Sequence, residues 1–123
     1  MTILCVDDDP DDLEVFKEAA YSINPEVKCL LAFDAEAAMK FLNDATILPD
    51  YIFLDINMPG MDGITFLKYL RTFDDFKEIP VVMYSTSISH PDYNESIKYG
   101  AVSFIQKAST LKDMYNSLRI FIA

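Results

Sequence analysis

The sequence predicts an α/β fold of five strand–helix units, (βα)₅, arranged as a doubly wound, five-stranded parallel sheet. Three observations support this class. Five short apolar runs alternate with longer segments of helical periodicity, two of the runs are apolar at every position, and the chain has 123 residues, enough for one core. Strands that are apolar throughout are covered on both faces, as in parallel sheets. The alternation therefore predicts helices on both sides of the sheet.

The five predicted strands are the short apolar runs, taken in order along the chain. They are ILCV at 3–6, VKCLLA at 27–32, YIFL at 51–54, PVVMY at 80–84 and VSFI at 102–105. The third and fourth runs have no polar position that would face water, so we expect both strands to be central.

The segments between the strands repeat apolar residues every three or four positions, which is typical of amphipathic helices. The five apolar faces are Leu13, Phe16, Ala20 and Ile23; Ala35, Ala38, Met39 and Leu42; Ile64, Leu67 and Leu70 with Phe66 and Phe73; Tyr93 and Ile97; and Leu111, Met114, Leu118 and Phe121. Capping residues mark the starts. The predicted caps are Asp9 before Pro10, Asp34, Ser89 and Ser109, and Gly100 is the predicted end of the fourth helix.

The charge and composition exclude several classes of partner and site. The formal net charge is −10, which disfavours direct binding to nucleic acid or to an anionic membrane. No run approaches 18 apolar residues and the N-terminus lacks the pattern of a secretion signal, so we expect a cytoplasmic protein that spans no membrane. Cys5 and Cys29 are expected to be small buried thiols rather than a disulfide. With a single histidine and no Cys-x-x-Cys pair, the sequence disfavours a zinc site.

Polar residues follow four of the predicted strands. They are Asp7 and Asp8 after the first, Asp55 after the third, Ser85 and Thr86 after the fourth, and Gln106 and Lys107 after the fifth. The carboxyl ends of parallel strands meet at one edge of the sheet, where ligands bind. We therefore expect three carboxylates, one or two hydroxyls and an ammonium group to gather there.

The gathered carboxylates indicate a cation site. Oxygen ligands without a nearby His or Cys favour Mg²⁺, with Mn²⁺ as a substitute. Magnesium readily takes a phosphate oxygen as a ligand, so this set of groups suits phosphoryl transfer. Asp55 would attack and form an aspartyl phosphate, while the metal and Lys107 would offset charge on the transferring group.

Four motifs occur in a fixed order along the chain: the pair Asp7-Asp8, LDINMPGMDG at 54–63, Ser85-Thr86 after PVVMY, and Lys107 after VSFIQ. This order resembles the receiver domain of bacterial two-component response regulators over essentially the whole chain, and LDINMPGMDG is the most specific match. The resemblance implies a flavodoxin-like fold with strand order 2-1-3-4-5. It also implies a single receiver domain over residues 1–123.

The resemblance implies roles for the acidic residues. Asp55 would be the phosphoacceptor. Asp8 would bind the metal directly and Asp7 through water. The backbone carbonyl of Asn57 would supply a further metal ligand.

The resemblance also implies roles on the fourth and fifth strands. Ser85 would donate a hydrogen bond to the phosphoryl group, Thr86 would occupy the small-residue position that opens access to the site, and Phe104 would change rotamer on activation. Two departures stand out: Ala108 replaces the proline that usually follows Lys107, and Phe104 lacks the hydroxyl of the usual tyrosine. A cis bond before a non-proline residue costs roughly 3–4 kcal/mol. We therefore expect the peptide between Lys107 and Ala108 to be trans, or cis and strained.

The function that these features favour is a phosphorylation-controlled switch. A histidine kinase or histidine phosphotransfer protein would donate the phosphoryl group, and the domain would catalyse that transfer and its own dephosphorylation. Because the sequence ends at residue 123, we expect a stand-alone receiver or a relay between phosphotransfer proteins. Its output would be contact with an unknown downstream protein, and a phosphorylation-dependent homodimer is a further expectation. One alternative is a receiver-fold docking module that is not regulated by phosphate. Another is a small metabolite phosphatase, but Asn57 stands where such enzymes typically have a second acid.

The remaining acids of VDDDPDD at 6–12 have a simpler interpretation. Acidic residues favour helix N-termini, so Asp9, Asp11 and Asp12 are expected to form a solvated helix start. A calcium loop is disfavoured, because Asp12 occupies the position that needs glycine and a strand rather than a helix precedes the loop.

Other conspicuous residues have equally plain interpretations. His90, which precedes Pro91, is expected to be a surface residue at a helix start rather than a phosphohistidine. Tyr99, Phe104, Tyr115 and Ile120 would form a partner surface if they faced outward, but core packing is the default expectation for each of them.

Overall fold

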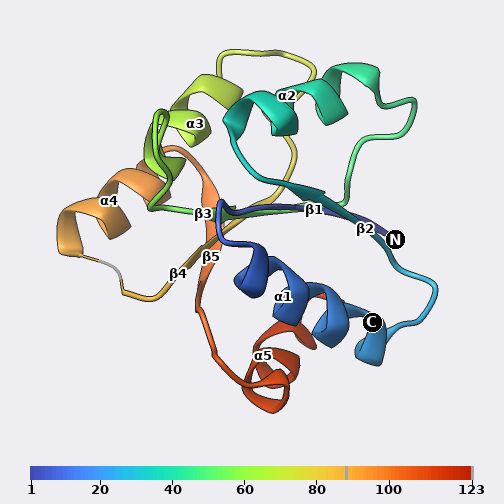
Figure 1. Ribbon diagram of the computed structural model, residues 1–123. Helices are drawn as coiled ribbons and strands as arrows, with labels where there is room; N and C mark the ends of the chain where they lie inside the picture. Colours follow the sequence, from blue (N-terminus) through green and yellow to red (C-terminus); the bar gives the residue numbers. More distant parts are fainter. Residues whose placement is uncertain (88, 123) are drawn as a thin grey trace.

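The computed structural model describes residues 1–87 and 89–122, and strands and helices alternate strictly along them. The strands are β1 Thr2–Val6, β2 Lys28–Ala32, β3 Tyr51–Asp55, β4 Val81–Ser85 and β5 Ala101–Gln106. They form one parallel sheet in the order β2-β1-β3-β4-β5 (Figure 1). The predicted fold class and strand order are confirmed.

Helices cover both faces of the sheet (Figure 1). They are α1 Pro10–Ile23, α2 Ala35–Asp44, α3 Gly63–Leu70, α4 His90–Lys98 and α5 Leu111–Leu118. The helices α1 and α5 pack on one face, and α2, α3 and α4 on the other. None of the helices described has both the length and the apolar character needed to cross a bilayer.

The core consists of two apolar clusters, one on each face of the sheet. Successive side chains of a strand point to opposite faces, so Cys5 packs towards α1 and α5 while Leu4 packs towards α2 and α3. Phe16 of α1 lies edge-on to Phe53 and Tyr84, with ring centroids 5.0 and 5.8 Å apart. The central strands are therefore buried along their length except at the first residues of β1 and β3, as their sequences predict.

The predicted helix starts are correct with one exception. The side chains of Asp9, Asp34 and Ser89 accept backbone hydrogen bonds as N-caps of α1, α2 and α4. The cap of α5 is Thr110 rather than Ser109, because the Thr110 hydroxyl accepts from the N–H of Asp113, at 3.2 Å.

Three other predictions need comment. Phe121 lies beyond the end of α5, yet it packs edge-on against Tyr51 with ring centroids 5.6 Å apart, so it belongs to the core without being helical. Both cysteines are free thiols; Cys5 is buried, but Cys29 is only half-buried because β2 is an edge strand. Gly100 follows α4 with φ of +82°, a left-handed conformation that favours glycine.

Candidate functional site

The carboxyl edge of the sheet brings together charged residues that are far apart in the chain. Asp7 follows β1, Asp55 ends β3 and Lys107 follows β5. The Lys107 Nζ lies 2.8 Å from Asp7 Oδ2 and 3.2 Å from Asp55 Oδ2. Both carboxylates are buried and the lysine side chain is nearly so. The expected meeting of strand ends is confirmed.

Asp8 completes a group of three carboxylates. One oxygen each from Asp7, Asp8 and Asp55 lies within 4.8 Å of the other two. Asp8 is exposed whereas the other two are buried, so the group reaches solvent at Asp8. Oxygen ligands at this spacing fit a hard divalent cation such as Mg²⁺ or Mn²⁺, which would keep water on its open side.

Burial and charge compete at this edge. Burial raises the pKa of the Asp7 carboxyl to about 6, although its hydrogen bond with Lys107 acts in the opposite direction. Burial lowers the pKa of the Lys107 ammonium, but hydrogen bonds to Asp7 and Asp12 outweigh this effect and hold the pKa above its ordinary value. Lys107 is therefore charged at neutral pH, and a cation at the edge would relieve the cost of burying Asp7.

The loop after β3 holds Asp55 in place. Asp55 Oδ1 accepts a hydrogen bond from the N–H of Asn57, at 3.2 Å, and the N–H of Gly63 donates to the Ile56 carbonyl, at 2.8 Å. A Cβ at position 63 would overlap the backbone carbonyl of Asp55, so only glycine lets α3 begin this close to β3. Gly60 has φ of +76°, which lets the loop turn back.

Two hydroxyl residues, Ser85 and Thr86, lie at the carboxyl end of β4 beside this edge. Ser85 is one residue beyond Tyr84, the β4 partner of Asp55, and its hydroxyl donates to the Ser87 carbonyl at 2.7 Å. The Thr86 side chain is exposed, and its carbonyl accepts from Gln106 at 3.3 Å. In this structure the Ser85 hydroxyl is thus engaged within its own loop.

Phe104 of β5 lies between α4 and a cavity. Its ring stacks on Tyr93 of α4 with centroids 4.8 Å apart and an interplanar angle of 26°. A cavity of about 350 Å³ is lined by Ser85, Thr86 and Phe104, together with Ser87, Ile105 and Gln106. The two predicted switch residues, Ser85 and Phe104, therefore face one open space.

The peptide bond after Lys107 is trans, because no bond between described residues is cis. The N–H of Lys107 donates to the Ser85 carbonyl at 2.8 Å, which extends the pairing of β4 with β5. Ala108 packs against the apolar cluster beneath α1 and α5. The lysine thus reaches the edge without proline beside it.

Asp12 has a contact that the sequence did not reveal. We expected it to be part of a solvated helix start, but its Oδ2 lies 3.0 Å from Lys107 Nζ. Asp12 lies in the first turn of α1, four residues after Asp8. The sequence carries no local signal for this contact, because Asp8 precedes the Asp9 cap and so a helical period cannot be counted from the acidic pair. The prediction remains correct for Asp9, which caps α1, and for Asp11, which is exposed.

The residues considered for a partner surface divide into two groups. Tyr115 and Ile120 are exposed, Ile120 to 79%. Tyr99 and Phe104 are half-buried and pack against the cluster beneath α2 and α3. His90 is the exposed first residue of α4, as expected of a surface residue at a helix start.

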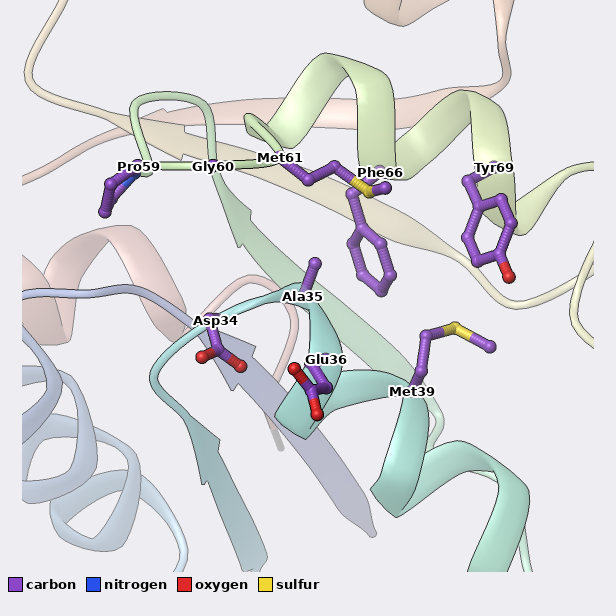
Figure 2. A pocket seen from close by; sticks show the side chains of 9 residues that line it. All are labelled: Asp34, Ala35, Glu36, Met39, Pro59, Gly60, Met61, Phe66 and Tyr69. Atoms are coloured by element: carbon purple, nitrogen blue, oxygen red, sulfur yellow. The ribbon is translucent and has the colours of Figure 1, made fainter.

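A groove of about 480 Å³ lies apart from the charged edge, between α2 and the segment formed by the β3–α3 loop and α3. Figure 2 shows Met61, Phe66 and Tyr69 on one wall and Met39 on the other, with Asp34 and Glu36 at the start of α2. Pro59, Gly60 and Ala35 complete its lining. The three clustered aspartates do not line this groove, so the groove and the charged site are separate.

The comparison with known families identifies the chain. The model of the response regulator receiver domain matches residues 3–119. The chain belongs to this family. It is therefore a receiver domain of the kind found in two-component systems.

Relatives and solved structures agree with this assignment. Response regulator Rcp1 from Synechocystis sp. is 29% identical over 122 residues, which cover 95% of this chain and 83% of Rcp1. A phosphorylated cyanobacterial phytochrome response regulator, RcpA, has a TM-score of 0.85 at 28% identity, over 96% of this chain and 88% of that one. The Mn²⁺-bound form of Rcp1 has a TM-score of 0.83 with the same identity and coverage. The chain spans only 13% of one other curated relative and about half of several more.

Proposed function

We propose that this receiver domain, taken as one unit over residues 1–123, is a phosphorylation-controlled signalling switch. Asp55 accepts a phosphoryl group from a histidine kinase or a histidine phosphotransfer protein. The observation that carries the proposal is the position of Asp55, which is buried, lies 3.2 Å from the Lys107 ammonium and shares a cluster with Asp7 and Asp8. A carboxylate held beside a fixed cation and a metal-binding pair is suited to attack phosphorus.

The cofactor of the reaction is Mg²⁺, with Mn²⁺ as a substitute. Asp8 would hold it directly, Asp7 through water, and Asp55 and the Asn57 backbone carbonyl would complete the protein ligands. When bound, the metal neutralises negative charge on the phosphoryl oxygens and orients them. The Mn²⁺-bound structure of Rcp1 supports this assignment, because Rcp1 shares the fold and more than a quarter of the sequence.

The transfer step needs little from the protein beyond position and charge. An oxygen of the Asp55 carboxylate attacks phosphorus, the new O–P bond forms, and the N–P bond to the donor imidazole breaks with its electron pair returning to nitrogen. Lys107 donates to a phosphoryl oxygen as charge redistributes. In a separate hydrolysis step, a water oxygen attacks phosphorus and the O–P bond to Asp55 breaks, with its electron pair returning to the carboxylate. Inorganic phosphate leaves, the proton lost by the water passes to the phosphate or to solvent, and the domain thereby limits its own signal.

The response to phosphate arises on the β4–β5 side. To reach the phosphoryl group, the Ser85 hydroxyl gives up its bond to the Ser87 carbonyl and donates to a phosphoryl oxygen instead. The loop after Ser85 then moves, and the 350 Å³ cavity provides the space for Phe104 to turn inward from its stack on Tyr93. Thr86 also lines this cavity, and the size of its side chain controls access to the phosphorylation site. The rearranged α4–β5–α5 region then contacts a downstream protein or a second copy of this chain.

Phosphorylation of Asp55→Asn is the direct test. Wild-type protein treated with phosphoramidate and Mg²⁺ should gain the mass of one phosphoryl group, and Asp55→Asn should gain none while keeping its circular dichroism spectrum. Asp44→Asn, which changes the last residue of α2, is the matched control and should behave as wild type. Uptake of phosphate by Asp55→Asn would show that the acceptor is another residue.

The metal assignment has a separate test. A ligand that binds only the native state stabilises it by mass action, by about 2.7 kcal/mol at a hundred times its Kd. Mg²⁺ should therefore raise the melting temperature of the wild type, and Asp8→Ala should lose most of this increase. An equal increase in Asp8→Ala would place the ion elsewhere.

The position of Lys107 supports a phosphorylation-controlled switch rather than a docking module that is not regulated by phosphate. Although Ala108 follows it, Lys107 lies at the charged edge with its ammonium shared among carboxylates. A complex of beryllium fluoride, which mimics an acyl phosphate, should shift NMR signals of α4 and β5 in the presence of Mg²⁺. Unchanged spectra would favour the docking module instead.

A further inference from the structure

Lys107 contacts a third carboxylate that lies outside the metal-binding group. Its Nζ is 3.0 Å from Asp12 Oδ2, compared with 2.8 Å for Asp7 and 3.2 Å for Asp55. Asp7 and Asp55 belong to the cluster whose oxygens approach one another, whereas Asp12 does not. The Asp12 side chain is 33% exposed, so keeping its charge costs less than keeping the charge of the two buried carboxylates.

The position of Asp12 is fixed by α1 and by β4. The helix begins with the Asp9 cap and Pro10, and it is anchored by the buried Phe16. The backbone carbonyl of Asp12 also accepts from the Tyr84 hydroxyl, at 3.5 Å. The Tyr84 ring lies under the Lys107 ammonium, 5.0 Å from Nζ to the centroid. Asp12 therefore approaches the ammonium from a rigid element.

We propose that Asp12 is a positioning residue that keeps the Lys107 ammonium at the reaction site throughout the phosphorylation cycle. This inference rests on the proposed function and adds to it the group that holds Lys107 in place. In the unphosphorylated domain three carboxylates share the ammonium. In the phosphorylated domain, Asp7 would hold the metal through water and Asp55 would carry the phosphoryl group. Of the three carboxylates, only Asp12 would then have no other ligand and could continue to hold the Lys107 ammonium.

The physical need for such a residue comes from the lysine side chain. Its four-carbon stem has large rotamer freedom, and holding it in one place costs roughly 2 kcal/mol. A charge-assisted hydrogen bond from a carboxylate on a fixed helix offsets much of this cost before the phosphoryl group arrives. Asp12 thus acts through Lys107 and does not itself touch the reacting atoms.

The test compares two neighbouring aspartates. Asp12→Ala removes the contact, and Asp11→Ala removes the same charge from the same helix turn, where the Asp11 side chain is exposed. With phosphoramidate and Mg²⁺, we expect the rate of Asp55 phosphorylation to fall about tenfold in Asp12→Ala, as loss of one charge-assisted hydrogen bond implies. Asp11→Ala should stay within about twofold of wild type, as expected for a surface charge.

A double-mutant cycle separates positioning from general damage. If Asp12 acts through Lys107, adding Asp12→Ala to Lys107→Ala should produce no further loss of rate. A further tenfold loss in that background would overturn the proposal, and so would equal rates for Asp12→Ala and Asp11→Ala. Thermal melts of all variants would confirm that each is folded.

A second measurement does not depend on phosphorylation. Lysine acylation followed by peptide mass spectrometry reports how freely the Lys107 amine reacts, and Lys107 should be modified several-fold faster in Asp12→Ala than in Asp11→Ala. Unchanged modification would overturn the inference even if Asp55 is phosphorylated. If the wild type took up no phosphate while Lys107 was still acylated faster in Asp12→Ala, the proposed function would be wrong and the positioning contact would still be supported.

Discussion

The two sides of the charged edge differ in how firmly they are held. On the β1–β3 side, Asp7 and Asp55 are buried, and α1 beneath them buries four side chains: Leu13, Phe16, Ala19 and Ala20. On the β4–β5 side, β5 is half-exposed, the β4–β5 register shifts between Val81 and Val82, and the only buried residue among the described positions of α4 is Ser96. The carboxylates proposed for chemistry thus lie on the firmly packed β1–β3 side, whereas Lys107 and the residues proposed for switching lie on the more exposed β4–β5 side.

This difference follows from where the apolar surface is. A helix that buries little apolar area costs little to move, and regions of this kind open at low free energy. Tyr93 and Ile97 of α4 are each 46% exposed, and Val102 of β5 is 56% exposed. A signal that begins at Asp55 can therefore change α4 and β5 without disturbing the strands that hold the carboxylates.

The largest expected effect contrasts one aromatic residue from each side. Phe16→Ala removes a fully buried ring that contacts Phe53 and Tyr84, and we expect a loss of about 3–5 kcal/mol in unfolding free energy. Tyr93→Ala removes a half-exposed ring and should cost about 1 kcal/mol. Urea denaturation measures both. Similar losses would show that α4 is as firmly packed as α1.

The second effect depends on pH and concerns Asp7. With the metal chelated, the Asp7 pKa is raised by burial from 3.8 to about 6, so the folded chain holds this proton more tightly than the unfolded chain. The free energy of unfolding should therefore fall as the pH rises from about 4 to about 6, by an amount on the order of 3 kcal/mol at most. Asp7→Asn should remove this fall and be more stable than wild type near neutral pH.

The control for that measurement comes from the β4–β5 side. Asp92→Asn changes a carboxylate in the first turn of α4, far from Asp7 in the chain, and should retain the fall in stability that Asp7 causes. If Asp7→Asn retained the full dependence, the buried carboxylate would not be its source.

The third effect tests the close approach of α3 to β3. Gly63→Ala places a methyl group against the Asp55 backbone carbonyl, so the helix start or the strand end must move. We expect a loss of about 1–3 kcal/mol and slower phosphorylation. Gly60→Ala has open space around its Cβ and suffers only from its positive φ, so it should cost about 1 kcal/mol. Equal effects at both positions would show that the loop accommodates the methyl group.

The smallest effect concerns the anchored end of α4. Arg71, just after α3, donates to the carbonyls of Tyr99 and Gly100, at 2.8 and 3.3 Å, and also to those of Lys77 and Ile79. Arg71→Met should cost about 1 kcal/mol globally, because these carbonyls regain water. Hydrogen exchange should quicken at the α4–β5 turn and stay unchanged in β1 and β3. Arg119→Met, in an exposed residue after α5, is the control.

The periodicity of the sequence sufficed to predict the fold class and the acidic group, whereas the strand order was predicted from the resemblance to receiver domains. Strands that are apolar at every position, with helices between successive strands, leave few arrangements other than a parallel sheet. Once the strands are parallel, residues just past their ends must share one edge, and Asp7, Asp8 and Asp55 accordingly form one cluster. These predictions rest on patterns within single elements and on their order, which the sequence displays directly.

Contacts between elements were decided by the tertiary structure alone. Asp12 and Lys107 are 95 positions apart, and their contact depends on how α1 packs against the end of β5. The same holds for Arg71, whose four carbonyl partners come from two separate turns, and for the Ser85 hydroxyl, which bonds within its own loop. The sequence determined by itself which residues lie at each strand end. Which side chains meet there was decided by packing, because a shift of one helix by a few ångströms would break such a contact and leave every local pattern unchanged.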